Sequence, residues 1–186
     1  MEMRIITGSA KGTRLKMVSG KHVRPTADHV KESFFQVIGP FFEGGLVLDL
    51  FCGTGALGLE AVSRGADRAI LIDSSRASCK VARANAQAAR LSAQVEIYRS
   101  DVLAGIRKLN KRQLKFDYIF MDPPYMKNLL TPVIEKLSFF DLLTEDGIIV
   151  AEHSSLSIPP QEIGSYQCYR RLNYGDTVIS LFEKAE

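Results

Sequence analysis

The sequence lacks long apolar runs and contains few cysteines. No apolar stretch among its 186 residues approaches the roughly 18 residues that a membrane-spanning helix requires. The first residues, Met1–Arg4, contain no apolar stretch of the kind found in secretory signals. Cys52, Cys79 and Cys168 are odd in number and widely spaced, without a C-x-x-C pair, which argues against a disulfide framework and against a zinc site. We therefore expect a cytoplasmic protein without a metal and without a membrane association.

Neither sign of charge dominates the sequence as a whole, but positive charge gathers near the N-terminus. The net charge is +3, whereas residues 1–31 alone carry seven Lys and Arg residues against two acids. A basic segment on a nearly neutral body is typical of one class of nucleic-acid-binding protein, although most charged side chains are simply solvated. Candidates for contacts with nucleic-acid phosphates are Arg4, Arg14, Lys16 and Arg24. The next candidates are Lys108, Lys111, Arg112 and Lys115.

Short apolar runs alternate with amphipathic helical stretches from residue 45 onward. The expected strands are 46–51, 68–73, 94–98, 116–121 and 147–152. The expected helices are 56–64, 76–91, 102–110 and 128–138. Such alternation predicts an α/β fold with a parallel sheet covered on both faces. Two further strands, 167–174 and 177–183, are joined at Gly175-Asp176, which makes the last strand antiparallel and gives a mostly parallel, seven-stranded sheet.

The segment 1–39 precedes this pattern and is expected to be an appendage of the core 45–186, within a single domain 1–186. Residues 3–18 read as a β-hairpin with a glycine-rich turn, and 19–25 read as a basic linker. Thr26 or Asp28 can cap a helix that runs to about Ile38.

A glycine-rich turn, Asp49–Gly58, closes the first core strand and opens a helix. It contains G-x-G-x-x-G, which also occurs in dinucleotide-binding proteins. Asp49 would repel a pyrophosphate but would favour S-adenosylmethionine, which carries a cationic sulfonium and a cationic amino group. Asp73 can accept hydrogen bonds from ribose hydroxyls, and Asp101 can either accept from an adenine amino group or cap the next helix. The predicted cofactor-binding residues are Asp49, Phe51, Cys52, Gly53, Gly55, Asp73, Ser74, Asp101 and Val102.

Asp122-Pro123-Pro124-Tyr125 follows the fourth core strand and faces the same crevice. The prolines lack N–H groups, so that carbonyls and the Asp122 carboxylate remain as hydrogen-bond acceptors. An NH2 group needs two acceptors, and binding both hydrogens would turn its lone pair toward a methyl donor. Tyr125 offers a flat face on which an extruded base can stack. The motif therefore predicts catalysis on an amino group, but it does not distinguish adenine, cytosine, guanine or glutamine.

The whole chain resembles the RsmD-type 16S ribosomal RNA guanine-N2 methyltransferases of bacteria. The resemblance is carried by 3–8 (MRIITG), 24–35 (RPTADHVKESFF), 48–55 (LDLFCGTG), 122–125 (DPPY), 152–153 (EH) and 174–177 (YGDT). It implies a class I methyltransferase fold, which is Rossmann-like, and S-adenosylmethionine as the methyl donor. It also implies that the substrate is a guanine of 16S rRNA in the small ribosomal subunit or its assembly intermediate. No obligate protein partner is indicated.

Three other functions are compatible with parts of the sequence. An adenine-N6 methyltransferase would use the same chemistry, although such enzymes acting on DNA usually need room for a sizeable recognition domain. A nicotinamide-dependent oxidoreductase would explain the glycines but neither Asp49 nor 122–125. A catalytically inactive RNA-binding module is disfavoured by the intact motifs. Glu152-His153 reads as a hydrogen-bonding pair at a strand end that shapes the pocket wall, because the transfer does not require His153 as a base.

Overall fold

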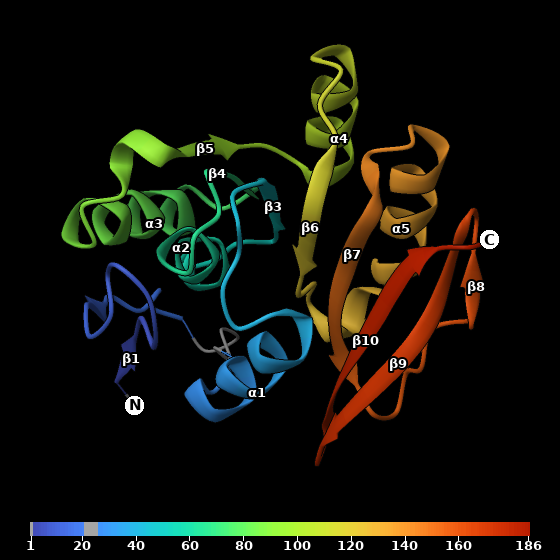
Figure 1. Cartoon of the computed structure of the whole chain (residues 1–186), viewed down its shortest axis with the longest axis horizontal. Coiled ribbons are helices and arrows are strands. Elements are labelled where there is room, and N and C mark those ends of the chain that lie inside the picture. Colours follow the sequence, from blue (N-terminus) through green and yellow to red (C-terminus); the bar gives the residue numbers. More distant parts are fainter. Residues whose placement is uncertain (1, 21–25) are drawn as a thin grey trace.

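The computed structural model describes residues 2–20 and 26–186, and a sheet of the order β5-β4-β3-β6-β7-β10-β9-β8 organises it (Figure 1). The strands are β3 (Leu46–Leu50), β4 (Arg68–Asp73), β5 (Val95–Arg99), β6 (Phe116–Met121), β7 (Leu143–Ser154), β8 (Glu162–Ile163), β9 (Tyr166–Tyr174) and β10 (Thr177–Lys184). Strands β3 to β7 are parallel, and β10 is antiparallel to both of its neighbours. The expected class I sheet is thus confirmed, with the two-residue β8 added at its edge.

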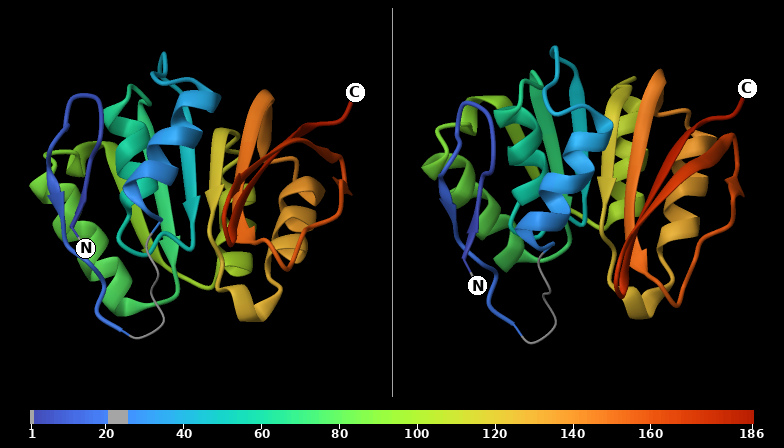
Figure 2. Two further views of the ribbon diagram at one scale, coloured as in Figure 1. Left: turned by 90° about the horizontal axis from the view of Figure 1, so that it is seen from below. Right: turned by 60° about the horizontal axis from the view of Figure 1, so that its bottom comes forward.

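Helices cover both faces of the sheet, as Figure 2 shows. The helices are α1 (Asp28–Ile38), α2 (Ala56–Ser63), α3 (Arg76–Ala88), α4 (Val102–Lys111) and α5 (Leu130–Phe139). One hydrophobic cluster joins α1, α2 and α3 to the sheet, and a second cluster joins α4 and α5 to its opposite face. Among the described residues, no helix is long and apolar enough to cross a membrane.

Local signals fix most boundaries of helices and strands, and the structure corrects the others. Helix α3 ends at Ala88 and not at residue 91. Ser75 caps α3 and Asp101 caps α4, each accepting a hydrogen bond from a backbone N–H in the first turn. Helix α1 has no side-chain cap, because Ala27 occupies that position and Thr26 bonds elsewhere. Helix α5 begins at Leu130 and not at residue 128, after the short helix η2 (Tyr125–Lys127). Strand β7 is longer than expected because it pairs with β6 from Leu143 and with β10 as far as Ser154.

The N-terminal hairpin is confirmed, but its paired part is short. Strands β1 (Met3–Arg4) and β2 (Arg14–Leu15) pair through two residues each. Met3, Ile5 and Leu15 are buried in the same hydrophobic cluster as α1, α2 and α3. The segment that the sequence sets apart as an appendage therefore shares its core with the sheet, since its apolar side chains are buried there and not within the hairpin.

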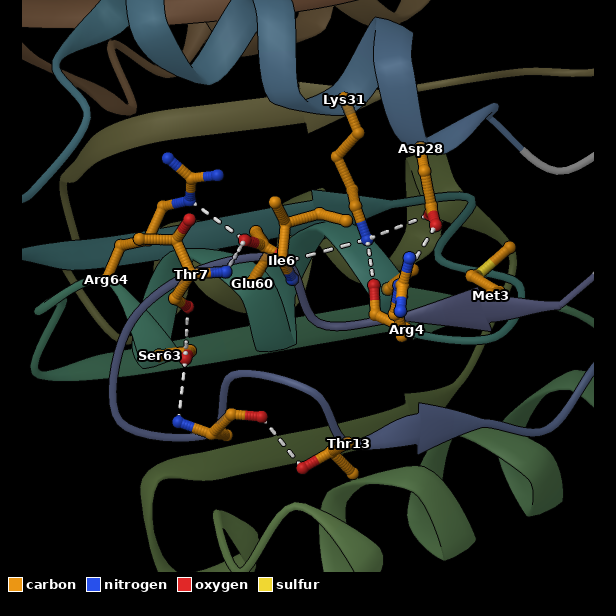
Figure 3. A network of polar contacts seen from close by, with 12 residues as sticks. Met3, Arg4, Ile6, Thr7, Thr13, Asp28, Lys31, Glu60, Ser63 and Arg64 are labelled. Atoms are coloured by element: carbon orange, nitrogen blue, oxygen red, sulfur yellow. Dashed lines mark hydrogen bonds and ion pairs between the residues drawn. The ribbon is translucent and has the colours of Figure 1, made fainter.

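A buried carboxylate on α2, that of Glu60, holds the N-terminal segment in place (Figure 3). It accepts hydrogen bonds from the backbone N–H groups of Ile6 at 2.9 Å and Thr7 at 3.1 Å. It also pairs with Arg64 at 2.9 Å and with Lys31 at 3.4 Å, and both cations are buried. Burial lowers the pKa of Lys31, and the charge of Glu60 opposes this effect. The network joins the N-terminal segment, α1 and α2.

We predict that Glu60→Ala lowers the free energy of unfolding by about 3–5 kcal/mol, because it removes the counter-charge of buried Arg64 and the nearer of the two acids that pair with buried Lys31. Urea denaturation measures the loss. The control is Glu145→Ala, which removes an exposed ion pair with Lys184 and should cost less than about 1 kcal/mol. Equal stability losses in the two variants would contradict the role assigned to Glu60.

Candidate active site

A cavity of about 690 Å³ opens where β3 and β6 end. Strand order reverses between these two strands, and ligands of such sheets bind in the crevice at this point. The cavity is lined by Met3, Thr26, Lys31, Asp49, Phe51, Cys52, Gly53, Thr54, Ala56, Leu57, Asp73, Ser74, Ser78, Asp122, Pro123, Pro124, Tyr125 and Lys127. Residues from the N-terminal segment and from three strand ends thus face the same space.

Asp49 near the end of β3 is a buried carboxyl group. Its Oδ2 atom accepts a hydrogen bond from the Gly58 N–H at 2.9 Å, which ties the strand to helix α2. Burial raises the pKa of Asp49 to about 8; the Gly58 N–H opposes this shift, and the charge of Asp73 adds to it. A cation in the cavity would favour the ionised form of Asp49.

The glycine turn leaves space for a ligand at one position and packs closely at two others. Gly53 has a φ of 53°, and a Cβ built there would meet nothing within 4 Å. A Cβ at Gly55 or Gly58 would lie 2.9 Å from the side chain of Leu71. Phe51 adopts a φ of 57°, a strained value for a residue with a side chain and one that is enriched at functional sites. Gly53 therefore faces the ligand space, whereas Gly55 and Gly58 let α2 approach the sheet.

Asp73 at the end of β4 holds the glycine turn while lining the cavity. Its Oδ2 atom accepts from the Gly53 N–H at 2.9 Å, and its Oδ1 atom accepts from the Ser75 N–H at 2.8 Å. Each carboxylate oxygen has a second acceptor site, so that these bonds leave capacity for ligand hydroxyls.

The segment Asp122–Tyr125 follows β6 and separates two cavities. Burial raises the pKa of the Asp122 carboxyl, and the nearby charges of Glu152 and Asp49 raise it further. Pro123, Pro124 and Tyr125 also line a smaller cavity of about 230 Å³ on the side of β7. The Tyr125 hydroxyl lies 3.4 Å from Glu152 Oε1 and 3.5 Å from Thr177 Oγ1, and its side chain is 39% exposed at the mouth of the site.

A family model described as "Conserved hypothetical protein 95" matches residues 3–183. The chain belongs to this family. It is 40% identical over 182 residues to a Bacillus subtilis (strain 168) protein named "Putative rRNA methyltransferase YlbH", covering 98% of this chain and 99% of that protein. "Ribosomal RNA small subunit methyltransferase D" of Escherichia coli (strain K12) is 28% identical over 98% of this chain and 90% of its own.

Solved structures agree with the fold. "Putative methyltransferase yhhF" from Escherichia coli superposes with a TM-score of 0.84 and 26% identity, over 99% of this chain and 98% of that chain. The resemblance to RsmD-type methyltransferases that the sequence motifs indicate is thereby confirmed.

The structure brings most of the predicted site residues of this family member together. Ten of the predicted catalytic and cofactor-binding residues line the larger cavity: Asp49, Phe51, Cys52, Gly53, Asp73, Ser74, Asp122, Pro123, Pro124 and Tyr125. Three predicted residues are not among its lining: Gly55 packs on Leu71, Asp101 is exposed and caps α4, and Val102 is buried in the second hydrophobic cluster. Their contact with a cofactor stays a prediction.

Sequence reasoning missed several residues of the cavity wall. These are Met3, Thr26, Lys31, Thr54, Ala56, Leu57, Ser78 and Lys127. Asn85 on α3 explains how the N-terminal segment reaches the glycine turn: its buried side chain donates to the carbonyls of Lys16 and Thr54 and accepts from the Lys16 N–H. Thr26 lies in the segment 24–35, which carries part of the family resemblance, and this resemblance is the sequence signal that points to it.

His153 is bound within the sheet. Its Nδ1 atom faces the Ser154 carbonyl at 2.9 Å, which requires Nδ1 to donate, and its Nε2 atom can then accept from the Ser180 hydroxyl at 2.7 Å. Burial lowers the pKa of His153, which favours this neutral form. The arrangement agrees with a residue that shapes the wall of the smaller cavity and does not indicate a base.

We predict that Asp49→Asn stabilises the ligand-free protein relative to the parent as the pH rises. The pKa of an aspartate in the unfolded chain is near 3.8, whereas the pKa of folded Asp49 is about 8. The contribution of Asp49 to the free energy of unfolding therefore decreases as the pH rises from the first value to the second. Asparagine removes this loss and can still accept from the Gly58 N–H. Urea denaturation at about pH 5 and about pH 9 measures the difference. Parallel pH profiles of parent and variant would sink this interpretation.

Proposed function

We propose that the chain transfers a methyl group from S-adenosylmethionine to the exocyclic N2 amino group of a guanine in the 16S rRNA of the small ribosomal subunit. The observation that carries this proposal is the juxtaposition of Asp49, Asp73 and the acceptor segment Asp122–Tyr125 around one cavity. Acids suit a cationic cofactor, and adjacent acceptors suit an amino group.

The cavity fits the cofactor in its chemistry. The carboxylates of Asp49 and Asp122 favour a positively charged ligand, Gly53 leaves room beside the turn, and Asp73 keeps acceptor capacity for ribose hydroxyls. We place the adenine toward Asp101 and Val102, past the end of β5. A pyrophosphate on the glycine turn would meet Asp49 instead, which disfavours the oxidoreductase alternative.

The acceptors at the end of β6 prepare the amine. The bound cofactor supplies an electrophilic methyl group. The Asp122 carboxylate and the Pro123 carbonyl accept the two hydrogens of the NH2 group, so that the nitrogen becomes more tetrahedral and its lone pair, otherwise delocalised into the ring, points along the line of transfer. The amine nitrogen would form a bond to the methyl carbon while the bond from that carbon to the sulfonium sulfur breaks, which leaves S-adenosylhomocysteine. The cationic amine would then lose one proton to Asp122 or to water. Tyr125 stacks on the extruded base.

The rRNA target rests on the relatives, since two of them are named as rRNA methyltransferases, one of these of the small subunit. The test uses small ribosomal subunits from a strain that lacks the gene. Incubation with the purified protein and isotopically labelled S-adenosylmethionine, followed by nucleoside mass spectrometry, should show N2-methylguanosine at one mapped position. Labelled N6-methyladenosine, or no labelled nucleoside, would overturn the proposal.

We predict that Asp122→Ala abolishes methyl transfer and largely spares cofactor affinity, because its carboxylate acts on the substrate amine in the transition state. Single-turnover assays measure the transfer, and calorimetry with S-adenosylhomocysteine measures the affinity. A variant that keeps a near-parental single-turnover rate would remove Asp122 from the catalytic role.

We further propose that the N-terminal segment holds the RNA. The side chains of Arg4 and Arg14 are 64% and 82% exposed, and Lys16 is exposed beside them. Arg14 lies 2.8 Å from Glu2, and Arg4 lies 4.0 Å from Asp28, pairs that are weak at the surface. Arg24 lies outside the described residues. Lys31 belongs to the same charge excess but is buried, so that it is not available to phosphates.

We predict that replacing Arg4, Arg14 and Lys16 by glutamine weakens RNA binding and lowers its salt dependence by up to about one unit of slope per lost phosphate contact. Filter binding at several salt concentrations measures both quantities, and affinity for S-adenosylhomocysteine should not change. The comparison variant replaces Lys108, Lys111 and Lys115. These lysines lie near the amino-terminal end of β6, whereas the cavity lies at its carboxyl-terminal end. RNA binding lost in the comparison variant and kept in the first would place the RNA elsewhere.

A further inference from the structure

Glu152 on β7 is a buried acid beside the proposed transfer site, and the proposed chemistry does not use it. It lines the smaller cavity together with Pro123, Pro124 and Tyr125, which also line the larger one. The Thr26 hydroxyl donates to its Oε2 atom at 2.6 Å, and the Tyr125 hydroxyl lies 3.4 Å from its Oε1 atom. Its charge also acts on Asp122, so the two carboxyls flank the same segment.

The acceptors of Asp122 and Pro123 treat every amino group alike, and selection must therefore come from an adjacent ring atom. In guanine two ring nitrogens flank the amino group, and one of them, N1, carries a hydrogen and donates. In adenine and cytosine the corresponding ring nitrogens, N1 and N3, carry a lone pair and accept. An acceptor on the protein next to the amine site thus pairs with guanine and faces a second acceptor in the other two bases.

We propose that Glu152 determines specificity by accepting the N1–H of the target guanine while Asp122 and the Pro123 carbonyl hold its amino group. This inference rests on the proposed function and names the residue that restricts methyl transfer to guanine. Thr26 and Tyr125 are positioning residues, since their hydroxyls bond to the carboxylate that lines the smaller cavity. Adenine in the same pose would turn the lone pair of its N1 toward the negative carboxylate, and a buried site rejects two acceptors that face each other.

The test uses a synthetic RNA fragment with either guanine or 2-aminopurine at the mapped position. 2-Aminopurine keeps the C2 amino group but has no hydrogen on N1. We expect the parent to methylate guanine about 10- to 100-fold faster than 2-aminopurine in single-turnover assays, which is the range for a hydrogen bond to a charged group. Glu152→Gln should reduce this preference to within a few-fold, because an amide can donate to the bare N1.

Two controls isolate the effect. Glu162→Gln changes an exposed acid on β8 in the same way and should keep the parental preference. The guanine-to-2-aminopurine rate ratio of each variant is divided by the same ratio of the parent. This quotient cancels the effect of the other difference between the two bases, the O6 atom that 2-aminopurine lacks. Calorimetry with S-adenosylhomocysteine and urea denaturation check that Glu152→Gln retains the cofactor cavity and the fold. Thr26→Val supplies a second route to the same readout, since it removes the donor that holds the carboxylate and should lower the preference for guanine.

The outcomes separate the inference from the function on which it rests. If the parent methylates guanine and Glu152→Gln keeps the full preference over 2-aminopurine, the role of Glu152 is overturned and the proposed function stands. If the parent methylates an adenine in the small subunit, both fail, since the carboxylate would then face an acceptor. A collapsed preference in Glu152→Gln, with Glu162→Gln unchanged, supports the inference.

Discussion

The buried carboxylate of Glu60 is the interaction on which the remaining architecture depends. One acid on α2 receives two backbone N–H groups of the N-terminal segment and pairs with two buried cations, Lys31 and Arg64. Charges are expensive to bury alone, and each of these groups is tolerated because the others are present. Since Met3 and Lys31 line the larger cavity, the network also determines one wall of the site.

The opposite wall is built from acids, and this determines which ligand the cavity accepts. Asp49, Asp73 and Asp122 stand at the ends of three adjacent parallel strands, a consequence of sheet order and not of closeness in sequence. In the ligand-free protein burial raises the pKa of Asp49 and of Asp122, so that part of their negative charge is suppressed. A bound cation favours the ionised form of both carboxyls and is attracted by it, whereas an anion is not stabilised by these groups.

The sequence predicts those parts of the molecule that depend on neighbouring residues. Strand and helix alternation, the cap Asp101 and the turn around Gly53 are encoded locally, and the structure contains them. The functional motifs at Asp49 and Asp122 come at the ends of parallel strands, so the sequence alone predicts that they lie at the same end of the sheet. These signals are short in range, which is why they can be read from a single chain.

What the sequence does not predict depends on contacts between distant segments. Lys31 counts as surface charge in the composition, but Glu60, 29 positions further along the chain, makes its burial possible. Thr26 resembles a helix cap, but its hydroxyl bonds to Glu152, 126 positions away. In both cases a polar group has a local alternative, solvent for the lysine and a cap for the threonine, and tertiary packing overrides it.

The N-terminal hairpin combines a fixed backbone with exposed side chains. The Lys16 backbone is bound on both sides by Asn85, which also holds the Thr54 carbonyl of the glycine turn. The Lys16 and Arg14 side chains, in contrast, extend into solvent. Because buried hydrogen bonds set the position of the strand, its cations can serve a polyanion without any change in the cofactor cavity. The same segment can therefore close the cofactor cavity with its buried face and receive RNA on its exposed face.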